Sequence, residues 1–104
     1  MTDMKDRERG FENKYAHDAE LQFKVEARRN RMLGEWAADL MGKSGDERAA
    51  YARDVVKADF AEAGDEDVYR KVKDDLGDRV SERELRDKMA SLREVAKEQI
   101  QNEF

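Results

Sequence analysis

Few side chains in this sequence could perform catalysis, and their spacing argues against it. His17 is the single histidine, and cysteine is absent, so no thiolate nucleophile or Cys-based zinc site can form. No Ser and Asp residues are arranged around His17 as a catalytic triad requires. The phosphate-binding patterns GxxxxGKS, GxxxxGKT and GxGxxG do not occur either. We therefore expect a protein that is not an enzyme and that has no catalytic residue, metal site or tightly bound cofactor.

A dense basic run is the remaining candidate for ligand binding. Arg28, Arg29 and Arg31 lie within four consecutive residues, and on a helix surface they could hold a carboxylate or a nucleotide phosphate. The alternative is a solvated helix face on which these arginines pair with Glu26 and Glu35. Composition alone leaves both interpretations open.

The composition favours a soluble helical protein. Charged residues make up 45% of the chain, hydrophobic residues 38%, and proline is absent. The net charge of −5 argues against non-specific binding to nucleic acid, which requires a basic surface. No apolar run approaches the roughly 20 residues that cross a bilayer, and residues 1–6 lack the apolar stretch of a signal peptide. We expect a cytoplasmic location without membrane insertion.

Apolar residues recur at three- and four-residue spacing in four segments, which predicts four helices joined by short links. The segments are about 17–41, Ser44 to Gly64, Asp65 to Gly77, and Ser81 onward. No segment shows the alternation that is typical of a strand. The prediction is an all-α fold, a four-helix bundle over residues 17–104.

Residues at the expected helix ends support these boundaries. Ser44 and Ser81 each begin a capping box, and Val80 and Leu85 occupy the two positions of a hydrophobic staple around the second box. The acidic run 65–67 lacks the ligand pattern of an EF-hand loop, so we interpret Asp65 as the N-cap of the third helix.

Two residues of the first helix bear on its packing. Trp36 lies in the middle of a strong apolar stripe, which favours packing in the core over stacking on a ligand. Gly34 lowers the helix propensity by about 1 kcal/mol relative to Ala, and it would let another helix approach closely.

The segment 1–16 differs from the rest of the chain. Its four basic and four acidic residues cancel, so the whole net charge of −5 belongs to residues 17–104. Its apolar side chains form only a narrow helical face, and a helix this short is marginal in water without a packing partner. We predict an arm that is largely disordered or frayed when free and becomes helical against a partner. The alternative is a frayed terminus without function.

Two blocks of sequence carry a resemblance to a known family. The first block is DRERGFENKYAHDAEL at 6–21, followed by FK at 23–24, EARRNR at 26–31, LG at 33–34 and WAA at 36–38. The second block is DF at 59–60 with AGDEDVYRK at 63–71. Both closely resemble the zeta subunit, the ATPase inhibitor of alphaproteobacterial F-type ATP synthases. The resemblance covers nearly the whole chain in register.

The resemblance implies a natural inhibitor of the ATP synthase with a division of labour. Residues 17–104 would form the four-helix body, and residues 1–16 would form the inhibitory arm. The arm would enter, as a helix, a catalytic interface between the alpha and beta subunits close to gamma. There it would block rotation in the direction of ATP hydrolysis, with synthesis much less affected. The family is also linked to weak ADP or ATP binding, so the alternative function is a nucleotide-sensing module with little inhibition.

On the implied mechanism, side chains of the arm contact the synthase. The apolar anchors would be Met4, Phe11 and Tyr15. The cations that would meet acidic groups are Arg7, Arg9 and Lys14. The carboxylates that would meet basic groups are Asp6, Glu8 and Glu12. The run Arg28, Arg29 and Arg31 remains a candidate for nucleotide or partner contact. Gly10 interrupts the arm and makes its ordering as a helix less favourable by about 1 kcal/mol relative to Ala.

Overall fold

Helices make up most of this protein. The computed structural model describes the backbone of residues 3–59 and 65–103, and the side chains of residues 19–59 and 65–103. Within these ranges there are four α-helices and no strand, which confirms the predicted all-α fold. The helices are α1 (Asp3–Leu40), α2 (Gly45–Ala58), α3 (Glu66–Leu76) and α4 (Glu82–Glu103), with a short 3-10 turn (Gly77–Arg79) between α3 and α4.

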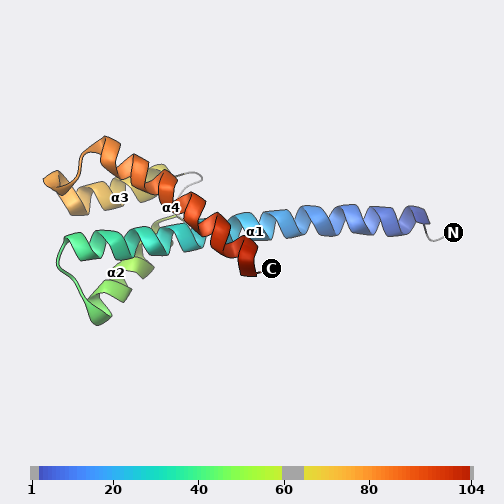
Figure 1. The fold of residues 1–104 in the computed structure, drawn as a ribbon, viewed down its shortest axis with the longest axis horizontal. Coiled ribbons are helices and arrows are strands. Elements are labelled where there is room, and N and C mark those ends of the chain that lie inside the picture. The colour runs from blue at the N-terminus through green and yellow to red at the C-terminus, as the bar shows by residue number, and fades with distance from the viewer. Residues whose placement is uncertain (1–2, 60–64, 104) are drawn as a thin grey trace.

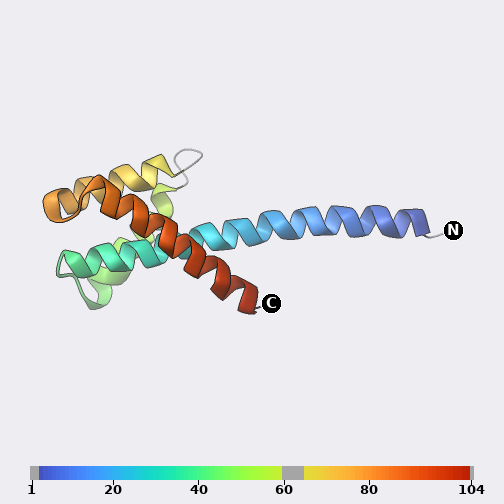
Figure 2. The same cartoon turned by 45° about the horizontal axis from the view of Figure 1, so that its top comes forward.

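α1 is the central element of the fold. It is 38 residues long and packs against each of the other three helices. Figures 1 and 2 show α2, α3 and α4 gathered around its C-terminal half, while its N-terminal part extends beyond them. The molecule is consequently elongated, with extents of 63 × 25 × 21 Å.

α1 begins at Asp3, earlier than the start near residue 17 that the sequence predicts. Packing of residues 19–40 supplies the helix nucleus, and extension from an existing nucleus is far less costly than nucleation, so the helix continues through Gly10. The boundary between arm and body is therefore not a break in secondary structure. Side chains of residues 1–18, including His17, lie outside the described part, and the mobility of residues 1–16 in the free protein stays a prediction.

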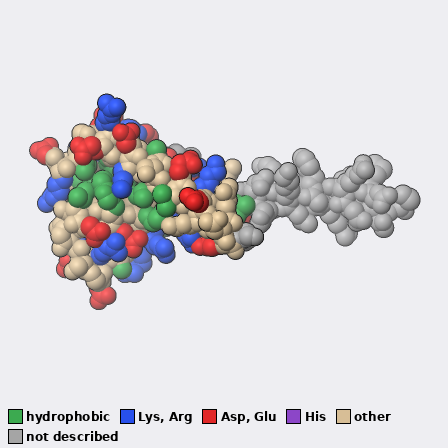
Figure 3. Space-filling model, in the orientation of Figure 1, with side chains coloured by type: hydrophobic (Ala, Val, Ile, Leu, Met, Phe, Trp, Pro, Cys, Tyr) green, Lys and Arg blue, Asp and Glu red, His purple; other side chains and the backbone are tan. Residues whose placement is uncertain are grey.

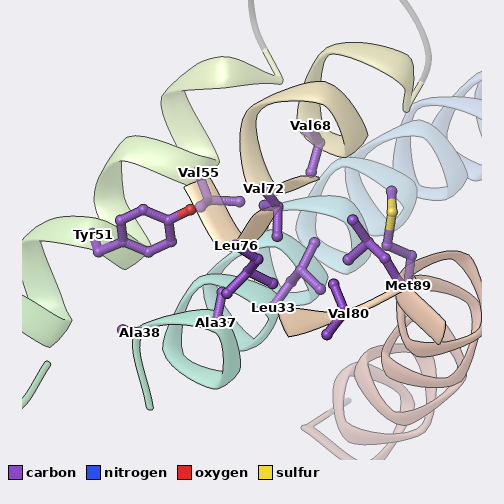
Figure 4. Close-up of a cluster of buried hydrophobic side chains, with 11 residues drawn as sticks. Leu33, Ala37, Ala38, Tyr51, Val55, Val68, Val72, Leu76, Val80 and Met89 are labelled. Carbon is purple, nitrogen blue, oxygen red and sulfur yellow. The ribbon is translucent and has the colours of Figure 1, made fainter. Parts of the chain in front are cut away.

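The main core lies where the C-terminal half of α1 meets the other helices. Figure 4 shows its side chains converging from all four helices and from the link before α4. The larger fully buried aliphatic members each contribute about 1.5–3 kcal/mol relative to an exposed position. The members are Leu33, Ala37, Ala38, Tyr51, Val55, Val68, Val72, Leu76, Val80, Leu85 and Met89.

Trp36 packs against this core, as predicted, but from its edge. Its indole is half-buried, and Lys88 Nζ lies 5.5 Å from the ring centroid. The ring therefore covers the apolar side chains below it and carries a cation on its outer side.

Gly34 marks the closest approach of α1 and α2. A Cβ atom at this position would lie 2.6 Å from the Cα of Ala52 and 3.2 Å from Cγ2 of Val55. This distance confirms that the glycine permits a second helix to pack against the backbone of α1.

The ends of α3 and α4 follow the predicted signals. Ser81 Oγ accepts a hydrogen bond of 3.1 Å from the backbone N–H of Glu84, which caps α4. Val80 and Leu85, the predicted staple, are both buried. Gly77 ends α3 with a φ of +56°, a left-handed conformation that glycine adopts without strain.

Ser44 and Asp65 stand at the N-cap positions of α2 and α3, as predicted. The capping hydrogen bonds expected of their side chains are absent, however. The carboxylate of Asp65 is instead engaged by Arg29, whereas nothing in the structure explains the missing cap at Ser44. α2 ends at Ala58, and the predicted end at Gly64 lies outside the described residues.

Candidate partner-binding surface

The predicted contact residues of the arm lie on the first part of α1. The backbone of residues 3–18 is helical, and at 1.5 Å per residue this segment is about 24 Å long. It continues α1 away from the bundle (Figure 1). The side chains from Met4 to Tyr15 lie outside the described part, so their individual roles stay predictions.

The C-terminal half of α4 holds the root of the arm, which we define as residues 19–32 of α1. Val25, Ala96 and Ile100 are buried together in a second, smaller core. Leu21 and Met32 pack against it. Because this second core lies between the arm and the main core, it fixes the direction in which α1 leaves the body.

Ion pairs join the same two helices around the second core. Arg28 pairs with Glu103 near the end of α4, and Arg93 Nη2 lies 3.7 Å from Glu26 Oε1. Such exposed pairs stabilise a fold by only about 0–1 kcal/mol each, so the apolar contacts dominate.

The three arginines of the predicted basic cluster have separate surroundings. Arg28 is bound to the end of α4, Arg29 is buried, and Arg31 is exposed. The glutamates suggested as their partners pair elsewhere: Glu26 with Arg93, and Glu35 with Arg48 at 3.1 Å. The structure therefore does not bring the three guanidinium groups together to hold one phosphate or carboxylate.

The positive charge of Arg29 is buried in the body, where two neighbouring side chains accept hydrogen bonds from it. Its side chain is 1% exposed, and it donates hydrogen bonds of 2.7 Å to Asp65 Oδ1 and of 2.7 Å to Asn30 Oδ1. The hydrogen bond from Arg29 lowers the pKa of the Asp65 carboxyl below its ordinary value, although partial burial acts in the opposite direction. This pair ties the root of the arm to the start of α3.

The surface of the body carries both signs of charge. Figure 3 shows acidic and basic side chains interspersed on one face, with hydrophobic side chains uncovered among them. Over the ranges with described side chains, no three His, Cys, Asp or Glu residues gather as metal ligands would. None of the helices, in the part of the chain that was searched, is both long and apolar enough to cross a membrane.

Comparison with known proteins agrees with the geometry. The family model for ATPase inhibitor subunit zeta matches residues 1–99. A solution NMR structure of a protein with 56% sequence identity covers 81% of this chain and 99% of its own, with a TM-score of 0.74. No curated protein matches. The match over nearly the full length, arm included, shows that this chain belongs to the ATPase inhibitor subunit zeta family.

Proposed function

We propose that this protein inhibits ATP hydrolysis by an F-type ATP synthase, and that its arm is the inhibitory element. The observation that carries the proposal is that α1 continues from a braced root out of the bundle to Asp3. The arm thus leaves the body in a shape that a groove between subunits can accept.

On this proposal the arm enters a catalytic interface between the alpha and beta subunits, close to gamma. A helix about 10–12 Å across, wedged between two subunits that must move during each cycle, opposes their movement sterically. The wedge blocks rotation in the direction of hydrolysis, while synthesis is much less affected. The protein acts as a regulatory subunit without catalysis of its own, on the cytoplasmic head of the membrane-bound enzyme.

The charges of residues 1–16 suit such an interface. The segment is neutral overall and carries both signs, so it can meet a mixed surface without a large net repulsion. Met4, Phe11 and Tyr15 would supply the buried anchors, and the flanking charged residues would set the register.

The alternative of a nucleotide-sensing module gains no support from the predicted cluster of Arg28, Arg29 and Arg31. It requires a cluster of cations at one phosphate, yet Arg28 and Arg29 are engaged with Glu103 and Asp65. Arg31, which is exposed, would have to act without them.

Removal of residues 1–16 tests the proposal. The shortened chain is expected to lose inhibition of ATP hydrolysis on purified cognate synthase, because the wedge is gone. Its circular dichroism is expected to retain the helical signal of the body, because both cores consist of residues beyond the arm. Inhibition as strong as that of the full chain would show that the arm is not the inhibitory element.

A further inference from the structure

A groove with an apolar floor and a basic rim runs between α1 and α2. Ala49, Ala52 and Val56 form its floor, and Arg31, Arg53 and Lys57 line its sides. Its volume is about 320 Å³. Glu35 lies at its edge, where Arg48 neutralises it.

A second hollow continues this groove toward the arm. It shares Arg31 and Val56 with the first and extends to Phe23, Lys24 and Ala27 at the root of α1. Its far side is formed by Ile100 and Glu103 of α4, and Glu103 is paired there with Arg28. Phe23 is 57% exposed, the most exposed of the large hydrophobic side chains whose positions are described. We call the two hollows together the α1–α2 groove; from Phe23 to Glu35 it follows α1 for about 18 Å.

The rim of the groove is a local excess of positive charge on an acidic protein. Arg31, Arg53 and Lys57 take part in none of the ion pairs formed among the described residues. Elsewhere on the body Arg29, Arg48 and Arg86 are each matched by carboxylates. The three rim cations therefore form a positively charged site that attracts an anionic partner.

We propose that the α1–α2 groove is a second contact surface, which docks an acidic segment with apolar side chains on the synthase head. This inference rests on the proposed function, because it takes the arm's partner to be that head. The floor would receive the apolar side chains, and the rim would pair with the carboxylates.

Continuity of α1 is the reason to assign the same partner to groove and arm. Tyr15, near the end of the arm, and Arg31, on the rim, lie on one helix and are about 24 Å apart along its axis. When the arm is inserted, the groove is held close to the entrance of its binding site. The two contacts then reinforce each other, because formation of the first raises the effective concentration of the second.

Reversal of two rim charges in the full chain tests the groove. Arg53 and Lys57 are exposed on α2, so the double variant Arg53→Glu, Lys57→Glu is expected to fold normally. We expect it to bind the purified head about tenfold more weakly at low salt, mainly through slower association. The difference is expected to shrink at high salt, where the charges are screened.

A matched control carries the same change of net charge at another place. Arg83→Glu with Lys97→Glu alters two exposed positions on α4 outside the groove, and its binding is expected to stay within about twofold of the unmodified chain. The exchange Arg53→Lys with Lys57→Arg keeps both charges and is expected to retain tight binding.

The outcomes separate this inference from the proposed function. Equal binding by Arg53→Glu with Lys57→Glu and by Arg83→Glu with Lys97→Glu would contradict the proposed contact at the groove, even if removal of residues 1–16 abolishes inhibition. Should the protein without residues 1–16 inhibit fully, the proposed function fails instead. If Arg53→Glu with Lys57→Glu changes the sedimentation of the free protein but not its binding to the head, the groove joins two copies of this chain and our assignment is wrong.

Discussion

Arg29 and Asp65 form a pair whose two members experience different surroundings. The arginine side chain is 1% exposed, whereas the aspartate side chain is 45% exposed. Water can solvate the carboxylate if its partner is lost, but it cannot reach the guanidinium. The consequences of removing each partner are therefore unequal.

We predict that Asp65→Ala destabilises the fold by about 3 kcal/mol, because it leaves a buried cation without its carboxylate. Arg29→Met, which keeps most of the side-chain volume, is expected to cost about 1 kcal/mol or less. Urea denaturation of the two variants measures the difference. Equal losses would mean that Arg29 reaches water in the folded protein.

The same pair predicts a response to acid. The pKa of Asp65 in the folded protein lies below its ordinary value of 3.8, so the pair stabilises the fold above that value and loses its effect as the pH falls through the folded-state pKa. The difference in unfolding free energy between the unmodified chain and Asp65→Asn is expected to be constant near neutral pH and to shrink below about pH 4. A difference that does not shrink on acidification below about pH 4 would contradict this assignment.

Residue patterns anticipate apolar contacts better than buried charges. Trp36, Ser81 and Gly77 take positions close to those predicted, because spacing and capping chemistry depend on local sequence. The run of basic residues places Arg29 in a surface cluster, although Arg29 lies four residues from both Val25 and Leu33 on the buried stripe of α1. That spacing was the available signal, but only the tertiary partner Asp65 makes burial of the charge acceptable.

At the scale of elements, α1 and α4 show what periodicity can and cannot reveal. Their apolar stripes predict helices correctly, and Gly34 indicates a close neighbour. The stripe of α4, however, divides between two cores: Leu85 and Met89 belong to the main one, and Ala96 and Ile100 to the second. A one-dimensional pattern cannot show where a helix passes from one partner to another.

Two glycines of α1 are predicted to respond in opposite ways to the same substitution. Gly34→Ala gains about 1 kcal/mol of helix propensity, but its Cβ would lie 2.6 Å from the backbone of Ala52. We expect a net loss of about 1–3 kcal/mol in thermal unfolding, because α1 and α2 must separate.

Gly10→Ala is the matched change in the arm. We expect it to leave the stability of the bundle unchanged and to strengthen inhibition up to about fivefold, because about 1 kcal/mol less is needed to order the arm. The inhibitory strength is measured by titrating ATP hydrolysis by the purified synthase with the unmodified chain and with Gly10→Ala. Weaker inhibition by Gly10→Ala would indicate that the bound arm is not helical at this position.

At the scale of the whole molecule, the two cores have separate tasks. The main core holds the four helices together, and the second core holds the root of the arm against α4. The family resemblance in the sequence implied the four-helix body and the inhibitory arm. The second core and the α1–α2 groove depend on residues that come together only on folding, since Arg31 lies on α1 whereas Arg53 and Lys57 lie on α2.

We predict that Ile100→Ala loosens the root without dissolving the main core. The side chain is 2% exposed, and its loss is expected to cost about 2 kcal/mol. Amide hydrogen exchange is expected to accelerate in residues 21–32 more than in α3. Inhibition is expected to weaken, because the direction of the arm relative to the body is no longer fixed. Uniform acceleration across all four helices would instead show that the two cores unfold as one unit.

Because α1 is one continuous helix, the rotational orientation of the arm depends on the number of residues between the arm and the second core. Each residue turns an α-helix by about 100°, so a one-residue insertion between the arm and the second core would rotate the far end by more than a quarter turn and present the wrong side to its target. Seven inserted residues would restore the orientation to within about 20° while moving the tip outward by about 10 Å. Homologues with spacers of different length are thus expected to differ by a nearly whole number of helical turns, such as seven or eleven residues.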